Sequence, residues 1–309
     1  ADDVSAVDEA MKNGYAWKWG PFEMIDQLGP RWFASKLRDR QLAVPPLLEA
    51  INEKQFYATN KHNQLEFFHA DHTYKQITRP DGVLMLSDIK RQTKRIKGNA
   101  SASAWDVGDG VLCLEFHTKM NSLDTAVFEM IEATLREAKD KNYRAIVVHN
   151  DGANFSAGVN LGLALFAANI AAWPEITKSV HQGQKMYKAI KYAPFPVVAA
   201  PSGMALGGGW ELLLHCDAVQ AHAETYAGLV EVGVGLVPAW GGCKELLYRW
   251  SQYTDHPKGP MPALTKVFEI IGTAQIATSA LEAKQYLSLI HIRRCRRIER
   301  CRSRWSPYH

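Results

Sequence analysis

The stretch PVVAAPSGMALGGGWELLLHCDAVQA, residues 196–221, decides the fold. It opens with PVVAA, a short and continuously apolar segment, as in strands of a sheet covered on both faces. Three consecutive glycines then lead into WELLLHC (210–216), which predicts a helix. AVQA (218–221) predicts a second strand directly after that helix. The stretch is therefore a strand–turn–helix–strand unit.

The same alternation continues toward the N-terminus. VLCLEF (111–116) predicts a strand, a helix is expected to begin at about Asp124, and AIVV (145–148) predicts another buried strand. Repeated strand–helix units favour an α/β domain with largely parallel strands. We assign this domain to residues 101–286.

The preceding residues have a different pattern. Apolar residues recur at helical spacing over 3–57, so we assign 1–60 to a small, all-helical segment. Residues 61–100 are polar and contain histidines, and they end in KRQTKRIKG, which predicts a linker with a charged helix. The domain boundary is expected near residue 100.

Composition excludes several classes of protein. With 309 residues, 47% hydrophobic and 22% charged, the chain is neither disordered nor collagen-like nor a disulfide scaffold. It contains no run of apolar residues long enough for a membrane span. The net charge of +4 arises from residues 287–309, which hold seven arginines and one glutamate. Because this tail resembles translated cloning sequence, we expect it to be non-native, and predict no nucleic-acid partner from its charge.

The first residues, ADDVSAVDEAMKNG, have neither the basic nor the apolar region of a signal peptide, so we expect a cytoplasmic protein of bacterial type. They also lack an initiating methionine, which suggests that the sequence begins inside a longer protein. His69 and His72 lie near His62 but without an acidic or cysteine cluster, and we predict no metal site.

Two glycine-containing turns are candidates for binding chemistry. GMALGGGWE (203–211) joins an apolar strand to a helix, where free backbone N–H groups can bind an anion or a developing oxyanion. NFSAGVNLG (154–162) follows the AIVV strand in the same way. Both turns together could direct one N–H each to a single carbonyl oxygen. Taken alone, each is equally compatible with a tight structural turn.

Two carboxylates accompany these turns. Glu211 lies just inside the helix after the glycines, and Glu231 lies in the apolar run GLVEVGVGLVP. A carboxylate among apolar residues is costly unless it is paired, hydrogen-bonded or functional. The alternatives are a helix N-terminal acid for Glu211, stabilised by the helix dipole, and a solvent-facing loop acid for Glu231.

In combination, NFSAGVNL, GMALGGGWE and YAGLVEVGVGLVPAWGG resemble the signature segments of the crotonase (enoyl-CoA hydratase/isomerase) family, in the family's order. The resemblance implies a crotonase-like ββα spiral fold. It also implies an oxyanion hole from the N–H groups of Ala157 and Gly208, with Glu211 and Glu231 as the acid and base. Further substrate- or CoA-binding positions implied by the resemblance are Ser156, Gly158, Asn160, Gly207 and Trp240.

The sequence departs from the family pattern at some of these positions. Asn160 stands where many members have Asp, while Trp210 and Trp240 are bulkier than the usual residues, so either tryptophan could narrow an acyl pocket. The apolar insert at 162–176 could line an acyl tunnel or pack into the core.

The segment ADDVSAVDEAMKNGYAWKWGPFEMIDQLG resembles the C-terminal helical domain of 3-hydroxyacyl-CoA dehydrogenases. The chain thus resembles an internal piece of a bifunctional fatty-acid oxidation enzyme. Its expected NAD-binding part would lie upstream, so we predict no redox cofactor for this portion and coenzyme A only as part of the substrate. A homo-oligomer or a thiolase partner is expected for the longer protein.

These resemblances predict reversible hydration of trans-2-enoyl-CoA to 3-hydroxyacyl-CoA. Both glutamates are required for hydration, whereas relatives that only shift a double bond often keep one. The alternatives are a Δ3-Δ2 enoyl-CoA isomerase and an inactive acyl-CoA-binding or assembly module.

Overall fold

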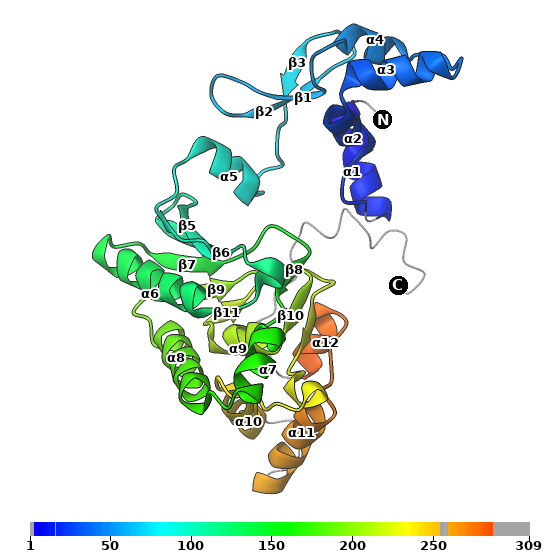
Figure 1. The fold of residues 1–309 in the computed structure, drawn as a ribbon. Helices are drawn as coiled ribbons and strands as arrows, with labels where there is room; N and C mark the ends of the chain where they lie inside the picture. Colours follow the sequence, from blue (N-terminus) through cyan, green and yellow to red (C-terminus); the bar gives the residue numbers. More distant parts are fainter. Residues whose placement is uncertain (1–2, 16, 254–256, 258, 287–309) are drawn as a thin grey trace. The chain divides into compact units, whose positions relative to one another are not determined.

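The computed structural model describes residues 3–15, 17–253, 257 and 259–286 (Figure 1). The chain divides between Gln92 and Thr93 into two compact units, slightly before the boundary predicted near residue 100. The tail that was predicted to be non-native, 287–309, lies outside the described residues.

The first unit opens with four helices, as the periodicity of residues 3–57 predicts. They are α1 (Val4–Tyr15), α2 (Pro21–Leu28), α3 (Pro30–Asp39) and α4 (Pro46–Ile51). Three of them begin at a proline, whose fixed φ suits the first helical position and whose missing N–H costs no helical bond there.

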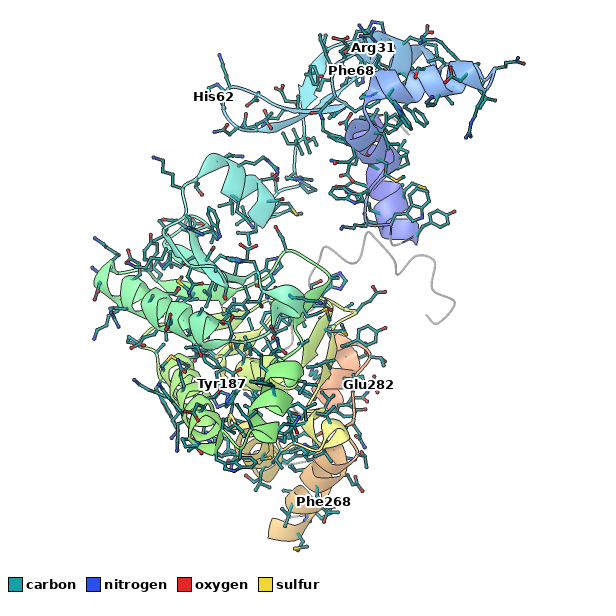
Figure 2. All side chains as sticks on the ribbon, in the orientation of Figure 1. Arg31, His62, Phe68, Tyr187, Phe268 and Glu282 are labelled. Atoms are coloured by element: carbon teal, nitrogen blue, oxygen red, sulfur yellow. The ribbon has the colours of Figure 1, made fainter. Side chains whose placement is uncertain are left out.

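The prediction of a linker over residues 61–100 is wrong for most of that stretch. A three-stranded antiparallel sheet is formed by β1 (Tyr57–Thr59), β2 (Leu65–Phe68) and β3 (Tyr74–Gln76), and α5 (Leu86–Gln92) follows it. Phe67 and Phe68 (Figure 2) of β2 are buried in one core with Val4 and Ile51. These strands are only three or four residues long, and their apolar residues are stabilised by packing in one core with the helices of the same unit.

Two carboxylates, the buried Asp8 and the half-buried Asp26, connect this sheet to the helices. Asp8 of α1 accepts hydrogen bonds from the N–H groups of Phe22 and Glu23, at 2.8 and 3.0 Å, and from the Tyr57 hydroxyl at 2.9 Å. Asp26 of α2 accepts from the N–H groups of Phe56 and Tyr57. Asp8 is 1% exposed, so removing its side chain would leave three donors without an acceptor.

Asp8→Ala is therefore expected to destabilise the first unit by about 2–4 kcal/mol. Hydrogen exchange should accelerate in α1, α2 and β1, while the helices of the second unit keep their protection. Asp81→Ala, at an exposed aspartate of the same unit, is the control. Unchanged exchange in the Asp8 variant would show that this carboxylate does not hold the sheet to the helices.

The described residues of the second unit form two sheets. Its strands are β4 (Lys97–Gly98), β5 (Ala102–Asp106), β6 (Val111–Phe116), β7 (Ala145–Val148), β8 (Asn154–Ser156), β9 (Val197–Ala199), β10 (Met204–Leu206), β11 (Ala218–Val219) and β12 (Tyr226–Gly228). The larger sheet has the order β11-β9-β7-β6-β5-β4, parallel from β11 to β6 and antiparallel beyond. The smaller sheet has the order β12-β10-β8 and is entirely parallel. The strands predicted from VLCLEF, AIVV and PVVAA are confirmed.

Helices surround these sheets (Figure 1). They are α6 (Thr125–Asp140), α7 (Leu161–Asn169), α8 (Trp173–Lys191), α9 (Gly208–His215), α10 (Gly242–Gln252), α11 (Pro260–Gly272) and α12 (Ala280–Gln285), with the short 3₁₀ helices η1 (Lys119–Asn121) and η2 (Glu231–Val234). Asp124 caps α6, as its position predicts, by accepting a hydrogen bond from Val127 N–H. Among the described helices, none combines the length and apolar character needed to cross a membrane.

The core explains how the candidate site is positioned. All eight residues of α9 are buried, and the helix contacts β8, β10, α8 and α10. Because β8 and β10 are adjacent and parallel, the two glycine-containing turns leave the same edge of the smaller sheet. This sheet brings NFSAG and GMALGGG together, although about fifty residues separate them in the sequence.

Candidate active site

The turn between β10 and α9 depends on glycine at position 207. Gly207 has φ 55° and ψ −126°, a backbone conformation that side chains disfavour. Its N–H donates to the Gly228 carbonyl of β12 at 2.8 Å, which fixes the turn against the neighbouring strand. This conformation directs the chain into α9.

The two glycine turns approach each other through their backbones. A Cβ placed on Gly158 would lie 3.0 Å from the Gly208 nitrogen, and one placed on Gly209 would lie 2.5 Å from the Ser156 carbonyl oxygen. A side chain at either position would therefore separate the turns. The glycine run permits this close contact as well as the turn itself.

The backbone donors at this contact are not equivalent. Gly208 N–H, at the start of α9, donates to no acceptor in the described part of the chain. Ala157 N–H donates to the Met120 carbonyl at 3.1 Å, and Gly158 N–H donates to Ser156 Oγ at 3.2 Å. Of the predicted pair of donors, the structure therefore leaves the Gly208 N–H free. To act as the second donor, the Ala157 N–H would have to share or break its hydrogen bond to the Met120 carbonyl.

Glu211 is buried in the first turn of α9. Its side-chain oxygen Oε1 accepts hydrogen bonds from Trp240 N–H at 2.9 Å and Gly242 N–H at 2.8 Å. Burial, reinforced by the negative charge of Glu231, raises the pKa of Glu211 to about 8. The N–H groups of the PAWGG segment thus hold a carboxyl group that shares a proton readily near neutral pH.

Glu231 begins η2 and lies next to Gly207. A Cβ on Gly207 would lie 3.3 Å from Glu231 Oε1, so the carboxyl group lies directly against the glycine turn. Its Oε2 is buried and has no hydrogen-bond partner within the described residues. Burial raises the pKa of Glu231 to about 7. The solvent-facing alternative for Glu231 does not agree with this geometry.

The structure places the Trp240 ring against the glycine turn. A Cβ on Gly208 would lie 2.5 Å from the Trp240 ring, and Trp240 is mostly buried against Phe128 and Tyr187. Trp210 directly follows the three glycines and is fully buried.

Ser156 and Asn160 have local structural partners. Ser156 is fully buried, and its Oγ accepts the Gly158 N–H. Asn160 caps α7, with its side-chain oxygen accepting from Gly162 and Leu163 N–H groups at 3.1 and 3.3 Å. Substrate contact by these two residues stays a prediction.

The apolar insert at 162–176 does not pack into the core at α7. No residue of α7 is buried, and Leu163, Leu165 and Phe166 are each more than 60% exposed. The alternative of core packing is therefore wrong for this helix.

Sequence reasoning missed two residues that contact the site. The carbonyl of Met120 accepts the hydrogen bond from the Ala157 N–H, the predicted second donor. Met120 itself has a left-handed backbone conformation, with φ 58°. Tyr187 donates a hydrogen bond from its hydroxyl to the Gly208 carbonyl at 2.6 Å. Neither has a sequence signal, apart from the helical spacing of Tyr187 with the apolar residues of α8.

Comparison with known proteins identifies the class to which this site belongs. Residues 106–249 match the family described as enoyl-CoA hydratase/isomerase. The crystal structure of an enoyl-CoA hydratase from Bacillus anthracis is similar, with a TM-score of 0.53 and 25% identity over 63% of this chain and 70% of that one. Residues 106–249 therefore match the enoyl-CoA hydratase/isomerase family, and the second unit has the crotonase fold.

Longer relatives show the setting of this domain. A probable 3-hydroxyacyl-CoA dehydrogenase of Bacillus subtilis is 38% identical over 92% of this chain and 36% of its own length. A putative fatty acid oxidation complex trifunctional enzyme of Rickettsia felis is 30% identical over 80% of this chain and 32% of its own length. The chain spans about a third of these relatives. The Bacillus match is long enough to include both units, consistent with an internal piece of a bifunctional enzyme.

The raised pKa values of the glutamates predict a pH-dependent stability. A carboxyl group whose folded-state pKa exceeds its unfolded value stabilises the fold below the unfolded pKa, near 4.5. That contribution is lost as the pH rises through 7 and 8. The melting temperature of the wild type should thus fall more than that of Glu211→Gln between pH 5 and pH 8. Equal falls would contradict the burial of an ionisable pair.

Proposed function

We propose that the second unit catalyses the reversible hydration of trans-2-enoyl-CoA to 3-hydroxyacyl-CoA in fatty-acid β-oxidation. The observation that carries this proposal is the convergence of Glu211 and Glu231 on the glycine turn that presents the free Gly208 N–H. The family match and the fatty-acid oxidation relatives support it.

The Gly208 N–H would donate to the thioester carbonyl oxygen of the substrate. Withdrawing electrons through this carbonyl makes C3 electrophilic and stabilises the enolate-like charge that develops during the reaction. The α9 N-terminus adds a favourable dipole to the same oxygen. If Ala157 contributes a second donor, its bond to the Met120 carbonyl must be shared or broken.

The two glutamates would move the protons. One carboxylate accepts a proton from water as the water oxygen bonds to C3, and the other carboxyl group gives a proton to C2. The C2=C3 double bond becomes a single bond, and the overall reaction adds one water. Raised pKa values near neutrality suit this exchange, because the pair can hold one proton between them.

The longer protein is proposed to combine this activity with a 3-hydroxyacyl-CoA dehydrogenase, the name that the Bacillus relative has. Its NAD-binding part is expected upstream of the first unit, and coenzyme A enters this portion as part of the substrate. Homo-oligomerisation or association with a thiolase, and a cytoplasmic location, are further proposals for the longer protein.

Replacing either Glu211 or Glu231 with Gln should lower kcat for crotonyl-CoA hydration by on the order of 10²–10⁴-fold, because each amide cannot exchange a proton. Loss of the absorbance of the conjugated enoyl thioester measures the reaction. Glu115→Gln is a matched control, since Glu115 is also buried but lies in β6, where it accepts from Trp105 Nε1.

Full activity of either variant would overturn the assignment. Conversion of a 3-enoyl-CoA in place of a 2-enoyl-CoA would favour an isomerase. Binding of both thioesters without turnover would favour a binding module.

A further inference from the structure

Tyr187 holds the carbonyl group of Gly208, the residue whose N–H is the free donor of the site. Tyr187, labelled in Figure 2, lies on α8 and is fully buried. Its hydroxyl donates to the Gly208 carbonyl at 2.6 Å. Burial raises the pKa of the Tyr187 phenol well above its ordinary value, so the hydroxyl stays protonated and remains a donor.

An aromatic cluster fixes the Tyr187 ring. Its centroid lies 5.7 Å from that of Trp240 and 6.4 Å from that of Phe128, both in edge-to-face geometry. The Trp240 ring also lies against Gly208, as well as against Gly183, one turn before Tyr187 on α8. Tyr187 and Trp240 thus contact Gly208 together.

Gly208 requires such support because it lies in a run of three glycines. Glycine has the widest choice of backbone conformations, and a donor is effective only when it is aimed before the reaction. Within the described residues, Gly208 N–H has no protein acceptor to orient it. Its carbonyl is the group that the protein can hold, and the Tyr187 hydroxyl binds that carbonyl.

We infer that Tyr187 is a positioning residue that aims the Gly208 N–H at the thioester carbonyl oxygen. The inference rests on the proposed hydratase function and deepens it. Tyr187 acts through the backbone of Gly208, by fixing the carbonyl on the other side of the Cα from the N–H, and not by contact with the reacting atoms. The alternative is that Tyr187 only fills the core.

The test is Tyr187→Phe, which removes the hydroxyl and keeps the ring. Cinnamoyl-CoA is the probe, because polarisation of its conjugated carbonyl moves its absorbance to longer wavelength. We expect the variant to bind this thioester within about threefold of the wild-type Kd, with at least half of the bound-state red shift lost. For crotonyl-CoA, kcat should fall about tenfold, with KM changed much less.

Tyr143→Phe is the matched control. The Tyr143 hydroxyl donates to Asp106 Oδ2 at 3.1 Å and makes no contact with Gly208, so this variant should keep the red shift and kcat. A wild-type red shift in Tyr187→Phe, once the variant is shown to be folded by circular dichroism, would overturn the inference. So would an equal loss of red shift in Tyr143→Phe.

Trp240→Phe provides a second variant if Tyr187→Phe fails to fold. It trims the ring that contacts Gly208 and leaves the Trp240 backbone N–H on Glu211. A partial loss of the red shift would agree with a role of the aromatic rings in holding Gly208, and an unchanged red shift would contradict it.

The Glu211→Gln variant distinguishes failure of the proposed hydratase function from failure of the positioning role of Tyr187. If it hydrates crotonyl-CoA normally, the proposed function fails, whereas a wild-type Tyr187→Phe beside an inactive Glu211→Gln defeats only the positioning role.

Discussion

The close backbone approach of two glycine turns is the constraint on which the site depends. Gly158 and Gly209 each lie so near the opposite turn that a methyl group would force the strands apart. The contact requires β8 and β10 to be adjacent and parallel, which in turn requires the rest of the smaller sheet. Fold and chemistry are therefore linked at one point, since the same contact that joins the turns presents the Gly208 N–H.

The electrostatics of the site follow from that geometry. Placing Glu211 in the first turn of α9 buries it, and burial alone would make its negative charge costly. Two backbone N–H groups from the PAWGG segment reduce this cost without adding a positive charge. Glu231 has no such partners for its Oε2. The two carboxyl groups thus have different surroundings, which is the condition for one to act as acid while the other acts as base.

Much of this arrangement could be predicted from the sequence, because the decisive residues are local. Three consecutive glycines between an apolar strand and a helix specify a turn with free N–H groups, and Glu211 follows at a fixed helical position. The resemblance to signature segments then identified Glu231. What sequence could not show depends on distant contacts. The short strands of the first unit form because β2 packs on Val4 and Ile51, and the bond from Ala157 to Met120 requires a left-handed residue in a separate loop.

The aromatic cluster shows how a bulky residue can be tolerated beside a glycine turn. Trp240 lies in a loop that also supplies its own N–H to Glu211, and its ring occupies space left by Gly183 on α8. A side chain at position 183 would displace the ring, and the loop carrying the Glu211 donors would move with it. Gly183 and Trp240 therefore behave as one steric pair, small on the helix and large on the loop. Through this pair α8 supports both the acid–base residue Glu211 and the residue Gly208, although α8 contributes no reacting group of its own.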